Sequence, residues 1–395
     1  MIRQPCMLKS GFTLMVTGHA LCSHFGITIS AWVRIGGITV TGLASVLSAQ
    51  ALILYGSGDP THNTTAPTGS LAGSGWQWQG IWGGLLGTSI APGYFITVAH
   101  VGGGTGQMFY VNGRNYVAVA SYLAPNADLR IWQVADTFDS FAPRYTGTAE
   151  RSKGIVFFGR GFPRGDAVVA SGIFGPETKG WYWGSGDPTT RWGTNTVATI
   201  TDTNGNSEPN GAALPGDLLR CTFDANAGTD EGTLSSGDSG GGAFVLDAGV
   251  WKLVGLNHAV ESDYRFSANG PDFSAAIYDR GGLYNDTSAG WVLVPDEPVN
   301  LPAAFYTTRL TGNESWIASV LAGQVTAERI MGVESAASPE GPYAAEPSAQ
   351  LQAAASQFVV PLANTARFYR LSSDYAVNVK SVTRSGSNIV LHFSP

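Results

Sequence analysis

Ser236-Gly237-Asp238-Ser239-Gly240-Gly241-Gly242 is the stretch of this 395-residue chain that decides its fold. Glycines on both sides of Ser239 leave the backbone free to turn sharply and to present N–H groups. A serine hydroxyl becomes a nucleophile only beside a base that takes its proton, and attack creates an oxyanion that needs N–H donors. The stretch therefore predicts a nucleophile at Ser239. The alternative is an ordinary Gly/Ser surface loop.

His100 is the best candidate for the base that Ser239 requires. The histidines beyond residue 51 are His62, His100, His258 and His392. His100 ends the apolar run 96–100, Ile-Thr-Val-Ala-His, in which a strand would hold the imidazole rigidly. Imidazole titrates near neutral pH, so it can accept a serine proton under physiological conditions. The alternative is a histidine packed in the core with its hydrogen bonds satisfied.

Asp128 is the best candidate for the acid that orients the imidazole. A carboxylate must hold the correct tautomer and stabilise the imidazolium. Asp128 follows a loop and precedes the apolar run 129–131, whereas Asp136 and Asp139 lie in a polar turn beyond a strand. The chain order His, Asp, Ser also matters, because unrelated folds carry the same three residues in other orders. This order favours a double β-barrel.

The rest of the pattern predicts an all-β protein. Only 13% of the residues are charged, against roughly 25% in a typical domain. No window from 76 to 260 shows a sustained helical period. Asn112-Gly113 between two apolar runs is a hairpin turn signal. Strands are expected at 94–98, 108–111, 116–119, 129–134, 154–158, 196–200, 243–247 and 250–256.

A helix is predicted over 313–322, followed by a change of composition. Asn313 is a suitable N-cap, and Gly323 can end the helix. Beyond it, residues 324–395 predict a small β-sandwich-like domain of a size that can fold alone. Its strands are expected at 356–362, 366–371, 376–383 and 387–393.

Residues 1–51 are predicted to be a leader. Residues 35–54 carry no charge and follow Arg34, and Ala49-Gln50-Ala51 has the small-x-small form of a signal-peptidase site. The alternative is an uncleaved anchor helix. Cleavage after Ala51 would remove two of the three cysteines and leave only Cys221, which is expected in a buried strand. No disulfide within the mature chain is then possible.

Four blocks in this order resemble the chymotrypsin/trypsin-like serine peptidase family. They are Thr97-Val98-Ala99-His100, the run 128–131, the run 237–241, and the run 302–307 followed by 315–317, which resembles the closing strand and C-terminal helix of that fold. The resemblance spans about 76–323, so we divide the chain into a leader (1–51), a peptidase domain (52–323) and a C-terminal domain (324–395). It implies two six-stranded barrels with a triad of His100, Asp128 and Ser239 between them.

The resemblance also implies an oxyanion hole and a substrate pocket. The N–H groups of Gly237 and Ser239 would bind the oxyanion. Thr233 would lie at the pocket floor, and the strand with His258 and Val260 would form a wall. A neutral floor argues against a preference for Lys or Arg. If His258 faces the pocket it would favour an acidic substrate residue, and otherwise it packs beside the barrel.

Two positions depart from the family. Val101 stands where many members have a cysteine, in agreement with the absence of disulfides. In many members the equivalent of Asp238 pairs with a new N-terminus made by zymogen cleavage. The apolar run 52–55 is one candidate for such an N-terminus. In the alternative, local side chains hold Asp238 and no zymogen step exists.

The sequence thus predicts an exported serine endopeptidase that acts on protein or peptide substrates. The alternatives are a catalytically silent binding protein on the same fold, and a surface-attachment role for the C-terminal domain. We expect a bacterial protein that is secreted, periplasmic or at the cell surface. A net charge of −7 argues against nucleic acid as a partner. We expect no cofactor and no metal, because the Ca²⁺-like alternation in residues 224–230 lacks a complete ligand set.

Overall fold

The computed structural model describes residues 52–172, 175–185, 189–208, 212–287, 289–363, 365 and 367–394. The predicted leader and its signal peptide or anchor lie outside these residues. Within the described part of the chain no helix is long and apolar enough to cross a membrane. Short 3₁₀ helices occur at η1 (Gly69–Leu71), η2 (Trp76–Trp78), η3 (Ala99–Val101), η4 (Thr311–Asn313) and η5 (Ala353–Ala355).

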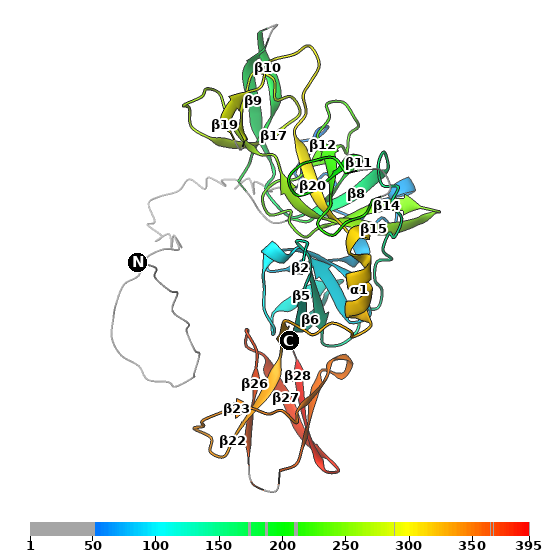
Figure 1. The fold of residues 1–395 in the computed structure, drawn as a ribbon, viewed down its shortest axis with the longest axis vertical. Coiled ribbons are helices and arrows are strands. Elements are labelled where there is room, and N and C mark those ends of the chain that lie inside the picture. The colour runs from blue at the N-terminus through cyan, green and yellow to red at the C-terminus, as the bar shows by residue number, and fades with distance from the viewer. Residues whose placement is uncertain are drawn as a thin grey trace, which may run out of the picture. The chain divides into compact units, whose positions relative to one another are not determined.

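Residues 79–134 form one antiparallel six-stranded barrel (Figure 1). Its strands pair in the order β6-β5-β2-β3-β4-β7, and β6 closes on β7. Trp82, Phe95 and Phe109 are completely buried inside it. The predicted turn joins β5 to β6, with positive φ at both Asn112 and Gly113. The strands are β2 (Gln79–Trp82), β3 (Leu85–Ala91), β4 (Tyr94–Thr97), β5 (Met108–Val111), β6 (Arg114–Leu123) and β7 (Arg130–Val134).

The second barrel is closed and has the strand order β11-β12-β20-β15-β14-β8. Phe157, Leu219 and Phe305 fill its interior together with Cys221, which is buried as expected. The predicted all-β double barrel is therefore confirmed. The strands are β8 (Gly154–Gly159), β11 (Arg191–Thr201), β12 (Leu218–Thr222), β14 (Gly242–Asp247), β15 (Val250–Val260) and β20 (Ala304–Arg309).

The predicted C-terminal helix is α1 (Glu314–Leu321). Ile317 and Val320 on its inner face pack into a core cluster that contains residues of both barrels. Asn313 occupies the N-cap position, but its side chain donates to the carbonyl of Arg309 and makes no capping bond. The helix thus covers the seam between the barrels.

A further sheet extends beyond the two predicted barrels. Its strands pair in the order β19-β18-β16-β17-β10-β9. The Lys179 ammonium is buried in it between Asp279 and Asp296, at 2.6 and 2.8 Å. The strands are β9 (Arg164–Gly172), β10 (Gly175–Trp183), β16 (Asp263–Arg265), β17 (Phe273–Ile277), β18 (Tyr284–Thr287) and β19 (Gly290–Leu293). Separately, β1 (Ile53–Leu54) pairs with β13 (Gly232–Thr233).

The C-terminal residues form two small sheets, which we call the C-terminal module (324–394). One sheet has the order β23-β22-β26, and the other β24-β25-β28-β27. The core between them includes Val333, Phe358 and Leu391, and it continues onto Val117 and Val119 of β6. In addition, β21 (Arg329–Ile330) pairs with β6. The remaining strands are β22 (Gly332–Ala336), β23 (Ala344–Ala345), β24 (Gln350–Gln352), β25 (Gln357–Pro361), β26 (Phe368–Ser372), β27 (Asn378–Ser385) and β28 (Asn388–Ser394).

Candidate active site

Strand pairing in the first barrel brings His100 and Asp128 together. Strand β4 ends at Thr97 and β7 begins at Arg130, and these two residues are register partners. The residues that follow Thr97 and precede Arg130 therefore lie at the same edge of the sheet. The backbone N–H of His100 donates to Asp128 Oδ1 at 2.9 Å, and His100 Nδ1 lies 2.5 Å from Asp128 Oδ2.

Ser239 reaches the same point from the second barrel. It lies in the turn that leads into β14, and its Oγ is 2.8 Å from His100 Nε2. Gly240 has a φ of +79°, and a Cβ there would collide with Thr97 Oγ1 and the Leu86 carbonyl. The turn is thus pressed against the first barrel so closely that only glycine fits. The structure brings together the three residues for which the sequence predicts a triad.

This arrangement is suited to proton transfer from serine. Because the Asp128 carboxylate accepts a hydrogen bond, the Nδ1 of His100 carries the proton, and Nε2 is left to accept from the Ser239 hydroxyl. The His100 side chain is 45% exposed and that of Asp128 is 20% exposed. A substrate can therefore reach the imidazole while the carboxylate remains partly shielded.

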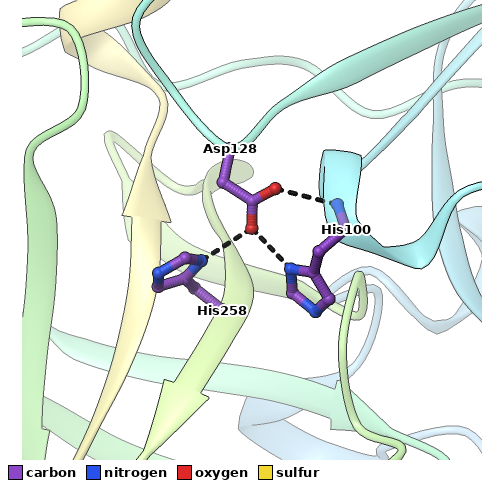
Figure 2. Close-up of side chains that lie close together, drawn as sticks. All are labelled: His100, Asp128 and His258. Carbon is purple, nitrogen blue, oxygen red and sulfur yellow. Dashed lines mark hydrogen bonds and ion pairs between the residues drawn. The ribbon is translucent and has the colours of Figure 1, made fainter. Parts of the chain in front are cut away.

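A second imidazole contacts the same carboxylate oxygen. His258 Nδ1 lies 2.7 Å from Asp128 Oδ2, and its ring meets that of His100 edge to face (Figure 2). Partial burial favours the neutral form of Asp128. The hydrogen bonds from His100 and His258 outweigh that effect and hold the pKa of Asp128 well below its usual value. The sequence predicts His258 at the pocket wall but does not predict this contact.

Asp238 faces away from the triad into the protein. Its carboxylate is completely buried and accepts hydrogen bonds from the N–H groups of Gly161 and Ser235, both at 2.6 Å, and from the Ser235 hydroxyl at 3.0 Å. Burial raises the pKa of Asp238 to about 6 against the effect of these donors. Local groups therefore hold Asp238 in the part of the chain that the structure describes.

The backbone around Ser239 can present N–H donors to an oxyanion. Gly237 adopts a φ of +95°, which favours glycine. Among the described residues, neither the Gly237 nor the Ser239 N–H has a hydrogen-bond acceptor. Both amides are thus available for a ligand beside the Ser239 hydroxyl.

A cavity of about 270 Å³ lies next to Ser239. Two of the three residues predicted for the pocket, His258 and Val260, line it. Thr233 does not, because it belongs to β13 and pairs there with Ile53. Among the described residues the lining contains no carboxylate and consists of Trp183, Leu234, Ser235, Ser236, Gly237, Ser239, Asn257, His258, Ala259 and Val260.

Asn257 holds the turn of Ser239 in place, and sequence reasoning does not identify it. Its buried side-chain amide donates to the carbonyl of Phe158 at 2.6 Å and to that of Asp238 at 3.0 Å. Its backbone also accepts from the N–H of Gly240 and donates to the carbonyl of Gly241. The signal for Asn257 in the sequence is its place as a polar residue directly after the apolar run 253–256.

The C-terminal module holds the loop that follows His100. Thr105 in the glycine-rich loop Gly102–Gly106 donates from its N–H and its hydroxyl to Asp374 Oδ2, at 2.8 and 3.1 Å. The N–H of Tyr375 donates to the Thr105 carbonyl at 2.9 Å. These contacts tie the loop next to the candidate base to residues far along the chain.

Two groups of side chains in the described residues have the composition of a metal site. The first is His100, Asp128 and His258. In the second, the three carboxylates of Glu177, Asp279 and Asp296 surround the buried Lys179 ammonium. The Ca²⁺-like run 224–230 has no shared centre, because Asp224 bonds to Thr222 and Asp230 to His62 and Asn63.

Comparison with known proteins finds no matching family model and no matching curated protein. Among solved structures the chain is similar to the inactive form of a serine-to-alanine mutant of Rv3671c from M. tuberculosis H37Rv. That match has 12% identity and a TM-score of 0.35, and it covers 66% of this chain and all of the other. An HtrA-type protease, AlgW with a decapeptide, matches with 13% identity and a TM-score of 0.33 over 60% of this chain and 52% of its own. The sheet order described above identifies the chymotrypsin-type fold.

Proposed function

We propose that this protein is an exported serine endopeptidase. The observation that carries the proposal is the continuous hydrogen-bonded chain from Asp128 through His100 to Ser239, at 2.5 and 2.8 Å. Each of its two contacts is the one that base catalysis by histidine requires. These hydrogen bonds cross the junction of the two barrels, and the second joins two residues that lie 139 positions apart in the sequence.

The proposed reaction proceeds through an acyl-enzyme. Ser239 Oγ attacks the substrate carbonyl carbon while its proton moves to His100 Nε2, and Asp128 stabilises the resulting imidazolium. The N–H groups of Gly237 and Ser239 bind the oxyanion. The imidazolium then protonates the leaving amine, and the peptide bond breaks. Water attacks the ester by the same route, with His100 again as the base, and releases the acid.

The cavity beside Ser239 supports a preference for a neutral side chain before the cleaved bond. In the described part of the chain, no lining residue is a carboxylate that could pair with Lys or Arg, and Leu234 and Val260 give the cavity an apolar part. The Nδ1 atom of His258 is engaged by Asp128. Cleavage of a peptide library should therefore give mainly neutral residues at this position. A majority of Lys or Arg would contradict the assignment of the cavity.

Covalent labelling tests the proposal directly. A fluorophosphonate probe should label the purified protein at Ser239, and Ser239→Ala and His100→Ala should abolish labelling. Ser236→Ala is the matched control, because Ser236 is an exposed serine in the same turn. A folded protein that the probe does not label would instead be the catalytically silent binding protein.

Export is tested separately. Secretion in a bacterial host followed by N-terminal sequencing should give a chain that begins at Leu52. If the chain retains its first 51 residues and sediments with membranes, the leader is an anchor.

A further inference from the structure

The side chains of His100 and His258 converge on the carboxylate of Asp128 (Figure 2). Oδ2 of Asp128 lies 2.5 Å from Nδ1 of His100 and 2.7 Å from Nδ1 of His258. The three side chains are 45%, 20% and 27% exposed, in the order His100, Asp128, His258. A solute therefore has access to all three without unfolding of the barrels.

We propose that this cluster binds Zn²⁺ and that the bound ion switches the peptidase off. Two imidazole nitrogens and a carboxylate oxygen form a common protein ligand set for zinc, with water as the fourth ligand. Regulation of the site rests on the proposed function, whereas binding of zinc does not.

The geometry requires only a small adjustment of the cluster, whose three ligand atoms lie within 4.8 Å of one another. Ligands of tetrahedral Zn²⁺, at bond lengths of about 2.0–2.1 Å, lie about 3.3 Å from one another. The two present N···O separations are shorter than this by less than an ångström. The charges are also suitable, because an aspartate carboxylate is ordinarily ionised at neutral pH and offers Zn²⁺ a negatively charged oxygen.

Zinc would inactivate His100 by reversing its tautomer. Without metal, Nδ1 carries the proton and Nε2 accepts from the Ser239 hydroxyl. A Zn–Nδ1 bond requires a free electron pair on Nδ1, so the proton of each neutral imidazole moves to Nε2 and no proton is lost overall. His100 Nε2–H can then only donate to Ser239 Oγ, and the serine has no base.

The cluster of His100, Asp128 and His258 holds no positively charged side chain at its centre, in contrast to the other candidate group. The carboxylates of Glu177, Asp279 and Asp296 already hold the Lys179 ammonium, which is almost completely buried. A cation would have to displace it. At His100, Asp128 and His258, by contrast, each imidazole proton only has to move from Nδ1 to Nε2.

Calorimetric titration with zinc chloride tests binding without any need for activity. The titrated protein is the Ser239→Ala chain, which cannot digest itself. We expect one zinc ion per chain, and His258→Gln in the same background should weaken binding at least about tenfold. His62→Gln is the matched control, because His62 is also a partly exposed histidine paired with an aspartate, at 2.8 Å from Asp230.

Zinc affinity that is equal in the His258→Gln and parent chains, or no binding up to about 1 mM zinc, would overturn the proposal. Where binding occurs, the active chain tests inhibition. Zinc should block fluorophosphonate labelling, a chelator should restore it, and His258→Gln should need at least about tenfold more zinc relative to its own zinc-free rate. Labelling that continues at saturating zinc would contradict the inhibitory role and leave the peptidase assignment intact.

Discussion

Asp374 accepts hydrogen bonds from the backbone N–H and the hydroxyl of Thr105, which lies 269 residues earlier and shortly after His100. The bonded loop begins at Gly102, directly after Val101, the position at which many chymotrypsin-like peptidases have a cysteine. This chain has no disulfide at that position. Contacts from the C-terminal module restrain the loop instead.

Asp374→Ala should therefore lower activity through the loop and leave the pocket unaffected. We expect kcat to fall several-fold with little change in KM, because a mobile loop lets the imidazole leave its productive orientation. Hydrogen–deuterium exchange of residues 99–106 should become faster. Asp374→Asn keeps one acceptor oxygen and should have a smaller effect, and the exposed Thr383→Ala should have none. A rise in KM with an unchanged kcat would argue against this role.

Removal of the C-terminal module after Gly323 should destabilise the barrels. It would expose Val117 and Val119, which are 1% and 0% exposed in the structure. Burial of a valine stabilises a fold by roughly 1.5 kcal/mol or more, so about 3 kcal/mol would be lost from these two residues. We expect a lower melting temperature by calorimetry. If the shortened chain is insoluble, Phe358→Ala in the full chain tests the same core, with an expected cost of about 3–5 kcal/mol.

Unchanged stability and labelling of the shortened chain would contradict this prediction. A fragment that ends at Gly323, melts at the same temperature as the full chain and reacts equally fast with the probe would show that the barrels do not depend on the module, as a surface-attachment role of the module requires.

Asp238 should make stability depend on pH in the acidic range. Its pKa in the fold is about 6, above the value near 3.9 expected when unfolded. The folded state thus keeps a proton that the unfolded state loses, and stability should fall as pH rises from about 4 to 6 and then level off, by about 3 kcal/mol from this group. Denaturant unfolding across this range measures it. Asp238→Asn should remove this part of the slope, and an unchanged slope would refute the assignment.

Asn257→Ala should impair both stability and catalysis. It removes the bonds to the carbonyl groups of Phe158 and Asp238, the second of which keeps the Gly241 N–H as a donor at 3.3 Å, and the loss of a bond to a buried group costs about 1–3 kcal/mol. The turn of Ser239 should loosen, so the rate of probe labelling should fall by more than the unfolded fraction explains. Asn257→Asp restores the size but not the donors, and it should not rescue labelling. Normal labelling by either variant would exclude a positioning role.

Much of the fold could be predicted because its signals are local. Alternating short apolar runs mark the strands, and the turn at Asn112 and Gly113 and the helix around Trp316 depend on neighbours in sequence. The added sheet from β9 to β19 has weaker signals, because a strand such as β9 buries only Val168 and Ala170 among its nine residues. The family resemblance places Thr233 at the pocket floor by its distance in sequence from Ser239, whereas in the structure Leu234 lines the cavity.

The sequence by itself determined the all-β class and the identity of three candidate catalytic residues, since a nucleophile, a base and an acid each need a residue type and a local setting that one chain segment can display. Tertiary structure alone decided which other groups share the site. His258 reaches Asp128 across 130 positions, and Asp374 reaches Thr105 across 269. Such contacts depend on how two barrels and a terminal module pack, because hydrogen bonds act over a few ångströms in space and do not depend on distance along the chain.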